Sequence, residues 1–132
     1  MSTTALPWVM LQLNTMAVVV RNDQKAAKWY HDKLGLRVAT RFPHWVTVAS
    51  RGSTVTLHLC PDSPPEKGNT GISFGTKDVA KQEKELRKKG VKITVPTTKA
   101  DYGTYLMFAD PDGNEFYFPY KGLEVKGTLQ TF

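Results

Sequence analysis

The feature of this sequence that most constrains its fold is an internal repeat. Asp23, which can cap the start of a helix, stands 12 residues before Gly35, which can end one. The same pair recurs 55 positions later as Asp78 and Gly90. A spacing repeated in this way indicates two structural units of the same kind within one chain.

Each half of the chain is expected to fold as strand, helix, strand, strand, strand. Apolar and β-branched runs predict strands at about 10–21, 36–41, 45–50 and 54–60, and then at 71–76, 91–95, 105–109 and 115–119. Helical spacing of apolar residues predicts helices over 24–34 and 79–89, capped by Asn22 or Asp23 and by Asp78.

This order predicts an α+β fold in which two tandem βαβββ modules form one domain, residues 1–132. The modules span about residues 10–60 and 70–120, and residues 61–69 form a linker rich in proline and glycine. One helix covers only one face of each sheet, so we expect both helices outside a curved mixed sheet. The other face would form a trough, and a concave surface between related modules is where a small-molecule site is expected.

Charge and cysteine content narrow the classes of partner. The formal charge is +6, but the lysines of the predicted second helix alternate with Glu83 and Glu85, which is typical of a solvated face. No nucleic-acid motif accompanies them, and no apolar run approaches the ~20 residues of a membrane span. The single cysteine, Cys60, favours a cytoplasmic protein without disulfides. We expect neither a nucleic acid nor a membrane as partner.

Two motifs resemble those of the vicinal oxygen chelate superfamily. The segment Trp29-Tyr30-His31-Asp32-Lys33-Leu34-Gly35-Leu36 resembles its FY…LGL signature, and Asp110-Pro111-Asp112-Gly113-Asn114 resembles its DPDGN turn. That superfamily includes glyoxalase I, fosfomycin-modifying transferases, extradiol dioxygenases and bleomycin-resistance binding proteins. The resemblance covers residues 10–120 and implies the same two-module fold, but a scaffold alone does not fix the chemistry.

Enzymes of this superfamily hold a divalent metal in the trough, and the resemblance places its ligands on the first and last strands of each half. The corresponding positions here are Met16, His58, Gly71 and Tyr117. A thioether, a glycine and a neutral phenol are poor ligands for such ions, and one imidazole does not make a zinc site. A shift of one residue in the first strand brings Thr15 or Ala17, which add no ligand. We therefore expect no metal and no other cofactor.

Strand alternation places aromatic, hydroxyl and sulfur-bearing side chains on the trough face, together with Val20. The candidate ligand-binding residues are Met16, Val18, Trp45, Thr47, Thr56, His58, Gly71, Ser73, Tyr105, Met107 and Tyr117. Such a surface suits a flat or partly apolar organic molecule. Glu115 is a candidate polar contact, and Tyr102 and Gly103 lie in a candidate lid loop. The alternative is that these side chains fill the space between the modules.

His58 is the histidine predicted inside the trough. It is a candidate general base or an anchor for an acidic ligand, and the alternative is a structural histidine held by hydrogen bonds. His31 and His44 are expected at the surface. The sequence does not decide between these roles for His58.

The sequence favours a metal-independent, non-catalytic binding protein for a small aromatic or amphipathic ligand, similar to the drug-sequestering proteins of antibiotic resistance. The +6 charge opposes capture of a cation, so we expect a neutral or anionic ligand. The resemblance implies a homodimer. The alternatives are a glyoxalase-like or dioxygenase-like metal enzyme, a metal-free acid–base enzyme that uses His58, and a protein-interaction domain with a filled trough.

Overall fold

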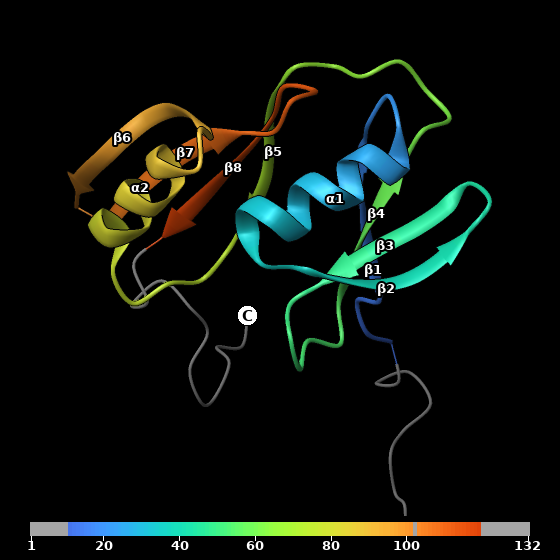
Figure 1. Cartoon of the computed structure of the whole chain (residues 1–132). Coiled ribbons are helices and arrows are strands. Elements are labelled where there is room, and N and C mark those ends of the chain that lie inside the picture. Colours follow the sequence, from blue (N-terminus) through green and yellow to red (C-terminus); the bar gives the residue numbers. More distant parts are fainter. Residues whose placement is uncertain (1–10, 102, 120–132) are drawn as a thin grey trace, which may run out of the picture.

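The computed structural model describes residues 11–101 and 103–119. Its elements are β1 (Thr15–Val19), α1 (Asp23–Leu34), β2 (Arg37–Phe42), β3 (Trp45–Ala49), β4 (Thr56–Cys60), β5 (Gly68–Ser73), α2 (Val79–Lys88), β6 (Lys92–Ala100), β7 (Gly103–Ala109) and β8 (Asn114–Pro119) (Figure 1). The first module is β1–β4 with α1, and the second is β5–β8 with α2. The predicted α+β order of two βαβββ modules is confirmed.

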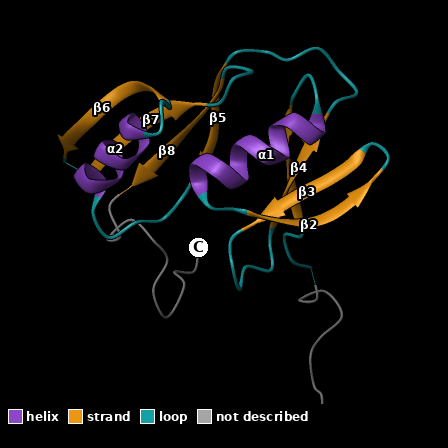
Figure 2. Ribbon diagram, viewed as in Figure 1, coloured by secondary structure: helices purple, strands orange, loops and turns teal. Residues whose placement is uncertain are grey.

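Both modules have the same strand topology. The sheet orders are β1-β4-β3-β2 and β5-β8-β7-β6, with the first and last strands of each module parallel and the other neighbours antiparallel. Figure 2 shows the two sheets side by side, each with its helix. Within the described residues no strand pairing joins the two sheets, so the expected curved sheet consists of two four-stranded sheets.

Side chains and glycines fix the helix ends, as the repeat predicts. The Asn22 side chain accepts a hydrogen bond from the Lys25 N–H at 2.9 Å, and Asp78 accepts one from the Lys81 N–H at 3.0 Å. Gly35 ends α1 with φ of 73°, a conformation that glycine adopts without strain. Asn22 is therefore the cap of α1, and Asp23 lies in its first turn. No helix in the described part of the chain is long and apolar enough to cross a membrane.

One strand lies earlier in the chain than its sequence indicates, and another is longer. β5 begins at Gly68, inside the predicted linker, because its backbone pairs with β8 from Gly68 opposite Asn114. β6 extends to Ala100 because it pairs with β7 from Lys92 to Ala100, with two irregularities on the way. Backbone pairing with a neighbouring strand thus overrides the weak strand propensity of these polar residues.

The core is one cluster of buried apolar residues drawn from both modules. Its second-module part is aromatic: the Phe108 ring centroid lies 5.7 Å from that of Phe116 and 5.2 Å from that of Phe118. Tyr30 of α1 meets the Phe116 ring edge-on at 5.9 Å. This contact joins the first helix to the second sheet.

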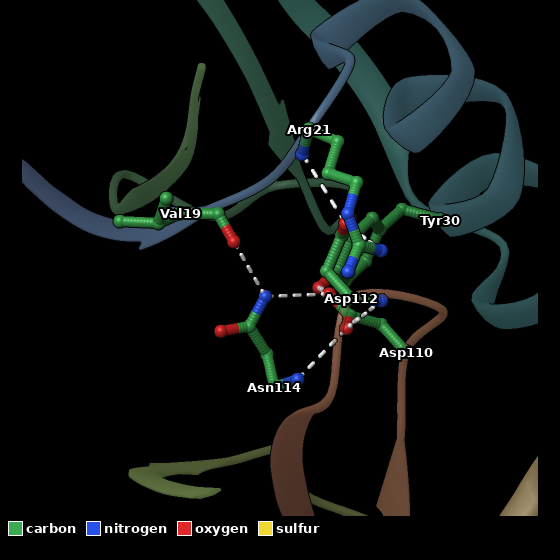
Figure 3. Close-up of polar contacts among 6 residues, drawn as sticks. All are labelled: Val19, Arg21, Tyr30, Asp110, Asp112 and Asn114. Carbon is green, nitrogen blue, oxygen red and sulfur yellow. Dashed lines mark hydrogen bonds and ion pairs between the residues drawn. The ribbon is translucent and has the colours of Figure 1, made fainter. Parts of the chain in front are cut away.

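A buried carboxylate also joins the modules. Asp110 Oδ2 accepts hydrogen bonds from the Tyr30 hydroxyl at 2.6 Å and from the Asn114 side-chain amide at 2.8 Å (Figure 3). Asp110 Oδ1 accepts from the backbone N–H groups of Asp112 and Asn114, both at 2.9 Å. Burial, and then the Asp110 charge, raises the pKa of the Tyr30 hydroxyl well above its usual value. Tyr30 therefore stays neutral and donates to Asp110.

Two further contacts extend this junction to the end of β1. The Asn114 amide donates to the Val19 carbonyl oxygen at 2.9 Å, and the Arg21 guanidinium lies 3.3 Å from Asp112 Oδ1. We call the whole group the module anchor; its residues are Val19, Arg21, Tyr30, Asp110, Asp112 and Asn114. It holds the β7–β8 turn against the first module.

Glu83 attaches α2 to β6. Its Oε1 accepts hydrogen bonds from the Thr97 N–H at 2.7 Å and from the Thr97 hydroxyl at 2.6 Å, and its Oε2 accepts from Arg87 Nε at 2.8 Å. These bonds, the Thr97 hydroxyl first, lower the pKa of Glu83 to about 2.

The Glu83→Gln variant is expected to lose pH-dependent stability. The ionised carboxylate stabilises the fold above its usual pKa of 4.5, and this contribution disappears as the pH falls toward 2. The free energy of unfolding of wild type in urea should therefore exceed that of the variant most at pH 7, and the difference between the two proteins should shrink between pH 4.5 and 2. Glu85→Gln, at a half-exposed residue of the same helix, is the control. If wild type were more stable than Glu83→Gln by the same amount at pH 7 and at pH 2, the ionised Glu83 carboxylate would not be the source of the difference.

Candidate functional site

The face of each sheet that points away from its helix is the trough face. In the first module, His58 lies opposite Thr47 on β3 and opposite Ala17 on β1. Val46 and Val48 alternate with Thr47 and are buried in the helix-side core. The placement of Trp45, Thr47, Thr56 and His58 on a shared face is therefore confirmed.

The prediction that Met16, Val18 and Val20 lie on the trough face is wrong. β1 runs parallel to β4 with Met16 opposite Leu57 and Val18 opposite Leu59, and both leucines are buried on the helix side. Val18 and Val20 are core residues, and Met16 is 37% exposed at the start of the strand.

Thr15 and Ala17 occupy the trough-face positions of β1 instead. A one-residue change of register moves every side chain of a strand to the other face. The run Ala17-Val18-Val19-Val20 carries no polar residue that would mark the exposed face, so the sequence leaves this register open.

His58 is held by its neighbours on the trough face. The His44 carbonyl oxygen can only accept, so the contact of 3.1 Å to His58 Nε2 places the proton on Nε2. The Trp45 ring packs on the imidazole with 3.9 Å between centroids and 34° between planes. His58 is buried, whereas Trp45 keeps 43% of its surface exposed. The imidazole thus supports an exposed aromatic ring.

Hydroxyl pairs occupy much of the remaining first-module surface. Thr40 and Thr47 share a hydrogen bond of 2.7 Å, and Thr15 and Thr56 share one of 3.0 Å. These hydroxyls satisfy one another, and Arg37, which lies opposite Ala49, brings a charged side chain to the same face.

Phe42 is a trough-face residue that the sequence analysis missed. It lies opposite Trp45 in the β2–β3 pairing and is 63% exposed. The predicted strand ended at residue 41, one position too early. Simple alternation along this strand does not predict the face of Phe42, because a bulge interrupts the strand between Val38 and Thr40. Val38 faces the helix, whereas Thr40 and Phe42 face the trough.

The second module contributes its own predicted set. Met107 and Ser73 both lie opposite Tyr117, and Tyr105 lies two residues before Met107 on the same strand. Ser73, Tyr105, Met107 and Tyr117 therefore share a face, as predicted. Gly71 has φ of 74° in an irregular part of β5.

The remaining candidates are placed as follows. Glu115 is half-buried on the face of Tyr117 and accepts a hydrogen bond from Thr94 at 3.4 Å. His31 and His44 are exposed, as expected. Gly103 begins β7, so it is part of a strand and not of a lid loop, and Tyr102 lies outside the described residues.

Three predicted residues also border a pocket of about 190 Å³, which we call the seam pocket. Met16, Thr56 and Ser73 line it where the first module meets the end of β5. Of the other predicted residues, Trp45, Thr47, His58, Tyr105, Met107 and Tyr117 lie on the two trough faces. Whether any of them contacts a ligand stays a prediction.

The donor atoms do not fit a catalytic metal centre. With the corrected register, the four positions implied by the resemblance are Ala17, His58, Gly71 and Tyr117. Only His58 supplies a good ligand, and its Nε2 is bonded to a carbonyl, whereas a zinc centre takes about three protein ligands. In the described part of the chain no group of three or more His, Cys, Asp or Glu side chains is placed to hold a metal.

Comparisons with known proteins agree with this fold. YetH of Bacillus subtilis (strain 168) is 28% identical over 113 residues, which are 80% of this chain and 94% of that protein. A superfamily member from Sphaerobacter thermophilus has a TM-score of 0.76 and 27% identity, over 85% of this chain and 98% of that one. TnmS3, an antibiotic binding protein from Streptomyces sp. CB03234, has a TM-score of 0.75 and 27% identity, over 84% and 96%.

The sequence model of one family matches residues 12–118, which include both modules, the module anchor and both trough faces. The chain belongs to the Glyoxalase/Bleomycin resistance protein/Dioxygenase superfamily.

Proposed function

We propose that this chain is a metal-independent binding protein that holds a small aromatic or amphipathic molecule against its trough face. The observation that carries the proposal is the Trp45 ring, which is exposed yet held in place by the buried His58 imidazole. An exposed aromatic side chain on a surface fixed by hydrogen bonds is pre-organised for stacking, which lowers the entropic cost of binding.

The neighbours of Trp45 favour the same class of ligand. Phe42 lies opposite it with most of its surface exposed, and the hydroxyls of Thr40 and Thr47 are bonded to each other. No charged side chain takes part in these contacts. The exposed rings match a planar ring system. Arg37 on the same face and the +6 charge of the chain favour a neutral or anionic molecule over a cation.

The relatives support binding without chemical conversion. TnmS3 is described as an antibiotic binding protein and shares 27% of its residues with this chain. The poor donor set at the four implied ligand positions favours a metal-independent site. We extend the proposal to a homodimer in the cytoplasm, with antibiotic capture as the role, and sedimentation of the purified chain tests the dimer.

A thermal-shift screen tests the proposal, with neutral, anionic and cationic planar aromatic compounds in the presence of a metal chelator. We expect neutral or anionic compounds to raise Tm and to quench tryptophan fluorescence. Trp45→Leu should weaken their binding about tenfold, which corresponds to ~1.4 kcal/mol of stacking and burial. Trp45→Phe, which keeps an aromatic ring, is the matched control and should retain most of the affinity.

Two results would overturn this function. One is binding that disappears in chelator and returns with added metal. The other is a set of ligands that bind Trp45→Leu as tightly as wild type, which would place the site elsewhere.

A further inference from the structure

We infer that the seam pocket is a second binding site, which takes a compact, neutral, apolar molecule about one ring in size. The pocket lies between the ends of β3 and β4 in the first module and the end of β5 in the second. It is separate from the stacked pair of Trp45 and His58, neither of which lines it.

The inner wall of the seam pocket is apolar and belongs to both modules. Val48 and Leu57 are buried core residues of the first sheet, and Ile72 and Phe74 of the second module are half-buried. A ligand here would extend the hydrophobic core across the junction. Burying such surface removes apolar groups from water, which is favourable.

The rim of the pocket is polar but carries no charge. Ser53 and Thr56 line it, and the hydroxyls of both are already hydrogen-bonded, to Val55 and to Thr15. None of the described residues that line the pocket has an ionisable side chain. An ion entering this pocket would lose its water without gaining a charged partner, so a neutral molecule is the fitting ligand.

The pocket exists because the β7–β8 turn is bonded to the opposite module and the corresponding β3–β4 turn is not. On one side, the β7–β8 turn is held against the first module by the bond between Asp110 and Tyr30. The β3–β4 turn has the corresponding place in the first module, and its hydrogen bonds are local, from Ser53 to Ser50 and Val55. Within the described residues none of its hydrogen bonds reaches the second module, which leaves this side of the junction open.

Volume sets the size of the ligand. An apolar cavity of ~150 Å³ lined by aliphatic and aromatic residues binds benzene. The seam pocket, at about 190 Å³, therefore has room for a substituted single ring. A larger pocket of about 310 Å³ at the other end of the second sheet is lined by Lys67, Lys92, Glu115 and Asp110, so it offers a charged comparison.

The test is a toluene titration of the whole chain, followed by NMR of the Met16 and Ile72 methyl groups. We expect saturable shifts of both methyl signals. Ser50→Leu and Ser53→Leu each add a larger side chain at the pocket wall, and each should weaken toluene binding at least about tenfold. Thr94→Leu adds a similar side chain at the charged pocket and should leave toluene binding unchanged.

The inference is overturned if toluene gives no saturable shift of either methyl, or if both folded filling variants bind it as wild type does. Two filling variants are used so that one unfolded protein does not decide the outcome. The Trp45→Leu variant should keep its toluene affinity, because Trp45 does not line the seam pocket. Loss of toluene binding in Trp45→Leu would count against a separate site.

Discussion

Replacing Asp110 with alanine is expected to lower the free energy of unfolding by about 4 kcal/mol, because it leaves four hydrogen-bond donors without their acceptor. The donors are the Tyr30 hydroxyl, the Asn114 side-chain amide and two backbone N–H groups of the turn. They lie in a buried region, so water replaces the carboxylate only in part. Urea unfolding at pH 7 measures the loss.

Two controls accompany this variant. Asp62→Ala removes an exposed carboxylate, which pairs with exposed His44, and should change stability by less than about 1 kcal/mol. Tyr30→Phe removes one of the four donors and keeps the ring against Phe116, so its cost should be about 1–2 kcal/mol. If Asp110→Ala cost no more than Asp62→Ala, the module anchor would not hold the two modules together.

Phe108→Ala is expected to cost about 3–5 kcal/mol, because it opens a cavity at the centre of the aromatic core. Phe108 is fully buried, and its ring contacts those of Phe74, Phe116 and Phe118. Phe74 follows β5 directly, and Phe116 and Phe118 belong to β8, so these rings cannot all move together to fill the space. The loss is measured by urea unfolding under two-state conditions.

Phe42→Ala is the matched control for the aromatic core. Its ring is 63% exposed, so its removal should change stability by about 0.5 kcal/mol or less. Similar losses for Phe42→Ala and Phe108→Ala would mean that the core is not centred where the structure places it. Since Phe42 lies on the proposed binding face, the same variant also tests ligand affinity.

Most of the fold could be predicted from local signals. Asn22, Gly35, Asp78 and Gly90 mark helix ends by chemistry that needs no tertiary contact. The duplication and the strand order followed from the spacing of 12 residues from Asp23 to Gly35, which recurs from Asp78 to Gly90. The trough-face set of the second module was also predictable, since Tyr105, Met107 and Tyr117 alternate with large apolar residues.

The rest depends on contacts between segments that are distant in sequence. The register of β1 is decided by its pairing with β4, and a run of apolar residues does not encode it. The packing of Trp45 on His58 depends on the hydrogen bond between His58 and the His44 carbonyl, and this bond forms only in the folded hairpin. The seam pocket likewise arises from how two turns meet the opposite module.

Metal content is the decisive measurement for the proposed function. Elemental analysis of the purified chain would be made before and after exposure to excess zinc, nickel and manganese, followed by desalting. We predict far less than one ion per chain under every condition, because one imidazole among the four implied ligand positions does not hold a metal. About one tightly bound ion per chain would contradict metal-independent binding and would favour a metal-dependent enzyme.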